Sequence, residues 1–220
     1  NFATKICSLV VMEVDQLETK IQLTKNSRLS QVDWQNLPFG KIFSDHMFCM
    51  DYKDGQWSNM QIKPYENLSM SPATSVIHYG QSCFEGMKAH RNQNGDIVLF
   101  RPYDNARRFN KSAHRMCMPS IDEDIFIGAL KKLISVDSSW VPENPDHALY
   151  IRPFMFAMDP FVGIRPSETY QFIIFTCPVG AYYTEPVPVK IETKYTRAVD
   201  GGTGFAKAAG NYAAALYPAK

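Results

Sequence analysis

Two long runs of apolar, β-branched and aromatic residues, 148–158 and 170–177, constrain the fold of this chain most strongly. Such residues favour extended strands, and runs of this length are long enough to form complete strands of a sheet. Shorter β-rich runs precede them, at 41–52 and from Ile62 onward, with an Asp-Gly turn at 54–55 between the two. We therefore predict β-strands in these segments.

Two helices are predicted between the early and the late strands. Pro102 is expected to open the first helix, which ends before Pro119. The second helix is expected to begin after Ser120 or Asp122, either of which can cap it. Apolar residues recur at helical spacing in both segments: Ala106, Phe109, Ala113 and Met116 or Cys117 in the first, and Ile125, Ala129, Leu133 and Val136 in the second.

The strands and helices together predict an α+β fold in two domains. The segment 180–188 mixes Gly, Pro and polar residues and is typical of a linker between domains. A strand is predicted after it, at 189–196. The predicted divisions are an N-terminal arm at 1–38, a small α+β domain at 39–179, the linker at 180–188 and the start of a larger domain at 189–220.

The composition is that of a soluble globular enzyme and favours neither a nucleic-acid nor a membrane partner. The 23 Lys and Arg residues balance the 22 Asp and Glu residues, so no overall field attracts polyanions. No apolar run approaches the ~18 residues that span a bilayer. The 5 cysteines show no Cys-x-x-Cys spacing. We therefore expect no metal site or disulfide framework, and a reducing compartment: the cytoplasm, or the mitochondrial matrix in a eukaryote.

One lysine, Lys207, lies among small residues in the run Gly-Gly-Thr-Gly-Phe-Ala-Lys-Ala-Ala-Gly-Asn-Tyr at 201–212. Small neighbours let a bulky planar partner approach the backbone closely. A lysine with few waters around it loses its proton more easily, and the neutral amine is the form that makes Schiff bases. Lys207 is therefore a candidate for carbonyl or pyridoxal chemistry. An ordinary surface lysine beside a flexible turn is the alternative.

The lysine run resembles the cofactor-lysine segment of branched-chain amino acid aminotransferases, the fold-type IV pyridoxal-phosphate enzymes. Other blocks match the same family in the family's order. They are Phe-Gly-Lys-Ile-Phe-Ser-Asp-His-Met at 39–47, His-Tyr-Gly-Gln-Ser-Cys-Phe-Glu-Gly-Met-Lys at 78–88, Phe-Arg-Pro at 100–102 with Asn105 and Arg108, Leu-Tyr-Ile-Arg-Pro at 149–153, and Cys-Pro-Val-Gly-Ala-Tyr at 177–182. The resemblance implies a complete small N-terminal domain and the beginning of a larger cofactor domain, without the family's C-terminal part.

The resemblance also implies an activity and a cofactor. It implies transamination of leucine, isoleucine and valine with 2-oxoglutarate, in branched-chain amino acid biosynthesis, by ping-pong half-reactions of a homodimer. Lys207 would form the internal aldimine with pyridoxal 5'-phosphate and move the proton of the substrate. Arg108 would bind the cofactor phosphate, which a guanidinium holds with two hydrogen bonds. Tyr212 would contact the ring oxygen of the cofactor.

Two residues of the block at 149–153 are candidates for substrate binding. Tyr150 and Arg152 are two apart on a predicted strand and so point to the same side. The resemblance places both at the substrate, with Arg152 on the distal carboxylate of glutamate or 2-oxoglutarate; a salt bridge on the sheet surface is the alternative. It also assigns Phe39, Tyr79 and Phe84 to the side-chain pocket, and for these the alternative is a plain packing role.

Two other functions stay open at this point. A sister fold-type IV enzyme, a D-amino acid aminotransferase or an aminodeoxychorismate lyase, would share Lys207. The block at 149–153 and the Gly-Asn-Tyr after the lysine favour the branched-chain enzymes. An inactive chain that acts only as an assembly partner is the third hypothesis, because the sequence stops at Lys220 while family members continue. We expect the sequence to be a fragment of a longer protein.

Overall fold

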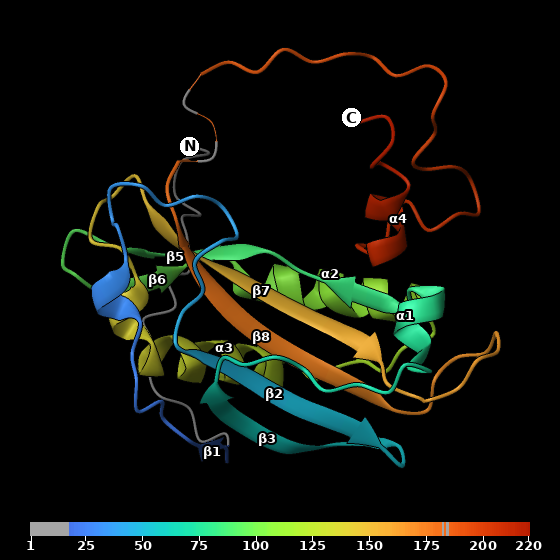
Figure 1. Ribbon diagram of the computed structural model, residues 1–220, viewed down its shortest axis with the longest axis horizontal. Helices are drawn as coiled ribbons and strands as arrows, with labels where there is room; N and C mark the ends of the chain where they lie inside the picture. Colours follow the sequence, from blue (N-terminus) through green and yellow to red (C-terminus); the bar gives the residue numbers. More distant parts are fainter. Residues whose placement is uncertain (1–17, 182, 184) are drawn as a thin grey trace, which may run out of the picture.

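The computed structural model describes residues 18–181, 183 and 185–220, and it confirms an α+β fold (Figure 1). Residues 1–17 of the predicted arm lie outside the described residues. The strands are β1 (Lys20–Ile21), β2 (His46–Lys53), β3 (Gln56–Pro64), β4 (Ser82–Phe84), β5 (Met87–Arg91), β6 (Ile97–Leu99), β7 (Ala148–Ala157) and β8 (Tyr170–Val179). The helices are α1 (Ser75–Tyr79), α2 (Pro102–Arg115), α3 (Glu123–Val136) and α4 (Ala209–Ala213), with short 3-10 turns at Leu29–Gln31 and Ser138–Trp140.

The described strands form one 8-stranded sheet. Its order is β1-β3-β2-β8-β7-β5-β6, and β4 also pairs with β7. The two long predicted strands lie together near the middle, because β7 and β8 run antiparallel from Ala148 opposite Val179 to Ala157 opposite Tyr170. Strands β4 and β5 both pair with β7. Residues that are far apart in the sequence therefore meet along β7.

Helices α2 and α3 form where the sequence predicts them. Pro102 is the first residue of α2, where its missing N–H breaks no helical hydrogen bond. Asp122 rather than Ser120 caps α3, because its carboxylate accepts hydrogen bonds from the next N–H groups of the helix. None of the helices in the described part is both long and apolar enough to cross a membrane.

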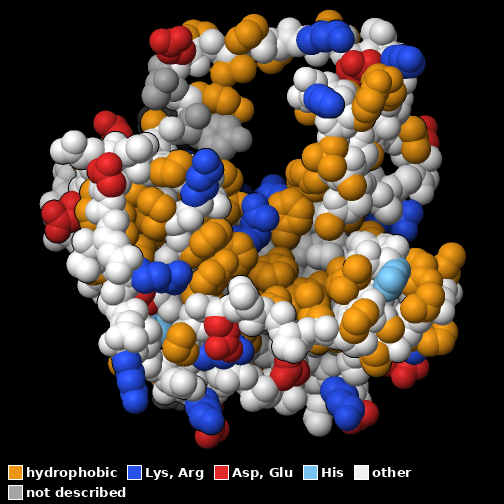
Figure 2. Space-filling view, in the orientation of Figure 1, with side chains coloured by type: hydrophobic (Ala, Val, Ile, Leu, Met, Phe, Trp, Pro, Cys, Tyr) orange, Lys and Arg blue, Asp and Glu red, His pale blue; other side chains and the backbone are white. Residues whose placement is uncertain are grey.

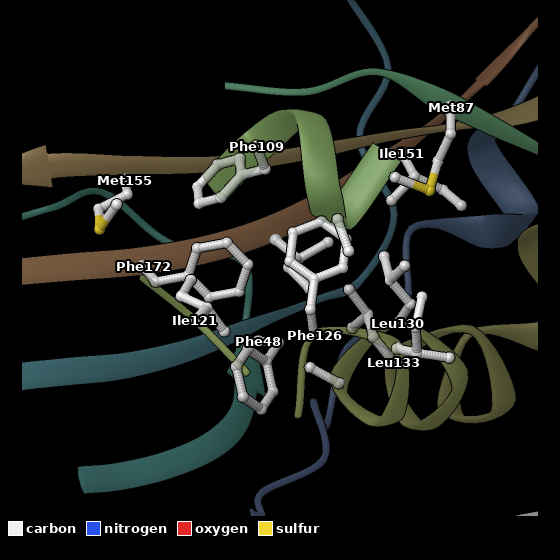
Figure 3. Packing of buried hydrophobic residues seen from close by; sticks show 14 of the residues in the cluster. Phe48, Met87, Phe109, Ile121, Phe126, Leu130, Leu133, Ile151, Met155 and Phe172 are labelled. Carbon is white, nitrogen blue, oxygen red and sulfur yellow. The ribbon is translucent and has the colours of Figure 1, made fainter. Parts of the chain in front are cut away.

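The main core lies between the two long helices and one face of the sheet (Figure 3). Phe109 of α2 and Phe126 of α3 pack against Phe172 of β8, with ring centroids 5.5 and 5.6 Å from that of Phe172. Leu130 and Leu133 of α3 are fully buried in the same cluster. This packing fixes α2 relative to the sheet, and α2 carries several residues of the candidate site.

Strand β7 presents a different set of side chains on each face. Ile151 and Met155 point into the core beneath the helices. Because side chains alternate along a strand, Tyr150, Arg152 and Phe154 lie on the opposite face. Tyr150 and Arg152 thus share a side, as predicted, and the helices support the sheet from behind.

The predicted strand at 189–196 is wrong. These residues form no strand and are exposed, with Val189 at 90% and Ile191 at 87%. A strand needs a partner for its backbone N–H and C=O groups, and no strand of the described part pairs with this segment. Residues 185–205 instead form an arch that leaves the sheet after β8 and returns to it near α4 (Figure 1).

Candidate active site

The backbone of Lys207 is fixed to both the sheet and helix α2. Its N–H donates to Ser112 Oγ of α2 at 2.9 Å. Its carbonyl accepts from the Phe84 N–H of β4 at 3.1 Å, and the next residue, Ala208, forms an antiparallel bridge with Cys83. These contacts from two elements determine the direction in which the lysine side chain leaves the backbone.

The glycine-rich turn before Lys207 depends on close backbone packing. A Cβ on Gly204 would lie 2.9 Å from the Cα of Ala198, closer than real Cβ atoms approach. Arg197 donates to the Gly204 carbonyl at 3.4 Å, and the buried Asn211 amide donates to two carbonyls of the turn at 2.8 and 2.7 Å. The small residues therefore allow a closed turn that holds the lysine at its end.

A buried carboxylate, Glu85, lies next to the Lys207 amine. Glu85 is 0% exposed in the link between β4 and β5. Arg108 of α2 donates two hydrogen bonds to it, Nε to Oε1 at 2.6 Å and Nη2 to Oε2 at 2.8 Å. Asn105 Nδ2 donates to Oε2 at 2.9 Å, and Lys207 Nζ lies 3.9 Å from the same oxygen. A buried charge is tolerated here because cationic and amide donors surround it.

Burial acts in opposite senses on these two charged partners. Burial would raise the pKa of Glu85, but hydrogen bonds from Arg108 and Asn105 and the charge of Lys207 outweigh it, so the pKa lies below its usual value. Burial lowers the pKa of Lys207; Glu85 opposes that shift, and the charges of Arg108 and Arg152 add to it. Glu85 therefore stays ionised, while Lys207 releases its proton more readily than a surface lysine.

A cavity of ≈ 340 Å³ opens beside Lys207. Arg108 and Arg197 line it together with the lysine, the Tyr212 ring and small residues of the glycine-rich turn. Figure 2 shows basic and hydrophobic side chains side by side in the hollow at the base of the arch. Two guanidinium groups and an amine favour an anion such as a phosphate or a carboxylate. A larger hollow of ≈ 580 Å³ near Trp34 lies apart from these groups.

On the sheet side of the site, the guanidinium of Arg152 lies over aromatic rings. Its central carbon is 4.5 Å from the ring centroid of Phe84 and 5.4 Å from that of Tyr150. Arg152 Nε and Nη2 donate to the Tyr150 hydroxyl at 3.2 and 2.9 Å. The Phe39 ring meets Tyr150 edge-on, with centroids 5.0 Å apart. A cation bordered by apolar rings suits a ligand that carries both a carboxylate and an apolar group.

Phe84 connects the two halves of the site. Its ring centroid is 4.8 Å from that of Tyr212 and 5.4 Å from Lys207 Nζ, and Arg152 lies over the same ring. Tyr79 is the exception among the predicted site residues. It ends α1, is 42% exposed, and its described ring contact is with the neighbouring histidine. The described contacts do not bring Tyr79 to the other site residues.

Gly86 determines how closely Tyr150 can pack. A Cβ on Gly86 would overlap the Tyr150 hydroxyl and lie 3.0 Å from Cζ. We expect Gly86→Ala to displace the tyrosine and to lower the free energy of unfolding by about 1–3 kcal/mol, measured by chemical denaturation. Gly210→Ala is the matched control, because nothing lies within 4 Å of a Cβ there. Equal losses in the two variants would contradict this expectation.

The site predicted from the sequence does not include Glu85, Ser112 or Arg197. Glu85 carries a signal, since an acid inside the largely apolar run Cys-Phe-Glu-Gly-Met needs partners when that run is buried. Ser112 lies one helical turn after Arg108 and therefore on the same helix face. No local pattern distinguishes Arg197 from a surface arginine, because its place at the cavity depends on the fold of the turn.

Curated proteins with similar sequences are described as branched-chain aminotransferases. Branched-chain-amino-acid aminotransferase 2 of Bacillus subtilis is 46% identical over 201 residues, which are 90% of this chain and 55% of that protein. Branched-chain-amino-acid transaminase 1 of the same organism is 47% identical over 189 residues, 84% of this chain and 53% of that protein. The chain thus spans about half the length of the curated relatives it matches. No protein-family model matches it.

Solved structures agree with this resemblance. The branched-chain amino acid aminotransferase of Escherichia coli matches with a TM-score of 0.58 and 26% identity, over 78% of this chain and 54% of that one. A T.th. branched-chain amino acid aminotransferase complexed with N-(5'-phosphopyridoxyl)-L-glutamate has the same fold, with a TM-score of 0.57 and 21% identity, over 76% of this chain and 52% of that one. The predicted resemblance and the predicted fold-type IV architecture are confirmed.

Proposed function

We infer that this chain is part of a branched-chain aminotransferase, which moves the amino group of leucine, isoleucine or valine to 2-oxoglutarate. The observation that carries the proposal is the meeting of two groups at one ring: the partly buried amine of Lys207 and the guanidinium of Arg152 both lie over Phe84. An amine for the chemistry and a cation for a carboxylate are what the reaction requires of the protein. The descriptions of the relatives agree with this assignment.

The residues around the cavity fit pyridoxal 5'-phosphate. Arg108 and Arg197 offer guanidinium groups to a phosphate. Gly204 and Ala206 leave room for a planar ring, and the Tyr212 hydroxyl would donate to its oxygen. When bound, this cofactor supplies the electron sink that makes the α-hydrogen of an amino acid acidic.

Lys207 acts as nucleophile and as acid–base group. Burial lowers its pKa, so a larger share of the amine is neutral near pH 7 than in an exposed lysine. The neutral amine would take the proton from the substrate α-carbon and deliver it to the cofactor, so that the amino group stays with the cofactor when the 2-oxo acid leaves. The hydrogen bonds of its backbone to Ser112 and Phe84 keep it oriented between the two events.

The sheet face binds the substrate. Phe84 and Phe39 provide apolar contacts for the side chain of leucine, isoleucine or valine. Arg152, already oriented by the Tyr150 hydroxyl, pairs with the distal carboxylate of glutamate or 2-oxoglutarate. One pocket thus accepts the apolar donor and the acidic acceptor in turn, as ping-pong half-reactions need.

The role of Arg108 is tested by comparing two forms of the cofactor. We expect Arg108→Gln to weaken binding of pyridoxal phosphate by about 10- to 100-fold, because charge-assisted hydrogen bonds contribute roughly 1.5–3 kcal/mol. Binding of pyridoxal, which lacks the phosphate, should change little; absorbance titration measures both. Arg107→Gln is the control, since Arg107 pairs with Asp104 and Glu123 at the surface. Equal losses for both cofactor forms would contradict the phosphate role.

Half-reactions with single amino donors test the activity itself. We expect L-leucine, L-isoleucine, L-valine and L-glutamate each to convert the bound cofactor to its amine form, and D-amino acids to fail. Loss of the cofactor's visible absorption band measures the conversion. Conversion by D-amino acids alone, or lyase action on aminodeoxychorismate, would replace this proposal with a sister fold-type IV activity.

We further propose that the complete protein is a homodimer, as the resemblance implies. Sedimentation equilibrium should then give twice the mass of one chain. A mass equal to that of one chain would contradict the dimer.

A further inference from the structure

We propose that Glu85 is a positioning residue that holds Arg108 in place and keeps a negative charge beside Lys207, with one carboxylate serving both. Its importance for catalysis rests on the proposed function, whereas the contacts do not. It would link the group that binds the cofactor phosphate to the group that performs the chemistry.

The carboxylate of Glu85 is held rigidly. Its backbone N–H donates to the Pro153 carbonyl of β7 at 2.8 Å. Both oxygens accept from Arg108, and Oε2 also accepts from Asn105 at 2.9 Å and from the Gly86 N–H at 3.2 Å. A side chain with this many partners cannot turn away from the site without losing several hydrogen bonds.

Glu85 is the one negative charge among the described charged groups that act on Lys207. The cationic groups are Arg108 from α2 and Arg152 from β7. The Tyr212 phenol of α4 borders the same cavity. Without the carboxylate, burial and two positive charges would drive the proton from Lys207, and Arg108 would lose the partner that holds it. The negative charge of Glu85 therefore offsets the positive charges of Arg108 and Arg152 around Lys207.

The first test measures how fast Lys207 is acetylated by trace acetic anhydride, in the full-length protein without bound cofactor. Only the neutral amine reacts, so the rate across pH reports its protonation. Glu85→Gln removes the charge that favours the ammonium, and at pH 7 the labelling rate should rise about tenfold, measured by peptide mass spectrometry. Unchanged labelling in the folded variant would overturn the proposal.

A control variant separates this local effect from a change in overall charge. Asp104→Asn removes an exposed carboxylate on the same helix as Arg108. The described ion-pair partners of Asp104 are Arg101 and Arg107. Labelling of Lys207 should be unaffected in this variant. An equal rise in Asp104→Asn and in Glu85→Gln would assign the effect to net charge and overturn the role of Glu85.

Glutamine is isosteric with glutamate and keeps an oxygen for Arg108, so we expect the variant to fold, which circular dichroism checks. If Glu85→Gln does not fold, Glu85→Asp takes its place. The shorter carboxylate keeps the charge but withdraws it from Nζ, and labelling should then rise by a smaller factor. The same rate as in the unchanged protein would contradict the proposal.

A second readout separates this inference from the proposed function. Glu85→Gln should weaken binding of pyridoxal phosphate more than binding of pyridoxal, because Arg108 keeps only one of its two hydrogen bonds to residue 85 and loses its charged partner. A protein that shows the labelling change but takes up no pyridoxal phosphate would support the charge role and contradict the proposed function. A protein that binds pyridoxal phosphate but shows unchanged labelling of Lys207 would support the proposed function and contradict the role of Glu85.

Discussion

Lys207→Ala is expected to lower kcat for transamination of L-leucine by about 10³-fold or more, because both the nucleophile and the proton-transfer group are lost. Coupled detection of the 2-oxo acid product measures the rate. Lys111→Ala is the matched control, since Lys111 is exposed on α2. Turnover of Lys207→Ala close to that of the unchanged protein would show that another group performs the chemistry.

Arg152→Leu is expected to separate the two half-reactions. The kcat/KM for L-glutamate should fall about 10²- to 10³-fold, because the distal carboxylate then enters an apolar pocket without its charged partner. The kcat/KM for L-leucine should change much less, since an apolar side chain needs no such partner. Stopped-flow measurement of each half-reaction gives the two values.

Tyr150→Phe serves as the comparison for Arg152→Leu. It removes the hydroxyl that orients Arg152 but keeps the cation and the ring. Its loss with L-glutamate should be smaller than that of Arg152→Leu. Equal losses with L-glutamate and L-leucine in Arg152→Leu would mean that Arg152 supports the fold of β7 rather than the acidic substrate.

Local signals were enough to predict the central elements. Strands β7 and β8 have long β-favouring runs, and helices α2 and α3 have a proline start and an aspartate cap. These features depend on residues close together in the sequence, so a single chain reveals them. The segment 189–196 has β-favouring residues as well, yet it forms no strand. Strand formation depends on a partner, and composition does not show whether one is present.

The site was predicted in its chemistry more than in its geometry. Residue type and the family resemblance point to Lys207, Arg108 and Arg152, and in the structure all three lie around Glu85 and Phe84. The role of the buried carboxylate could not be derived from the sequence, because residues 85, 108 and 207 meet only after the sheet and α2 have packed. Tyr79 shares its motif with Phe84, but its described ring contact is with His78, so the structure gives no contact that supports its predicted role.

The most direct test of the account is borohydride reduction of the full-length protein with pyridoxal phosphate, followed by peptide mass spectrometry. We predict one reduced adduct, on the peptide that contains Lys207. Addition of L-leucine before the reduction should suppress this adduct, because L-leucine converts the cofactor to its amine form. An adduct on other lysines only, or no adduct at saturating pyridoxal phosphate, would contradict the claim that Lys207 is the reactive amine of an aminotransferase.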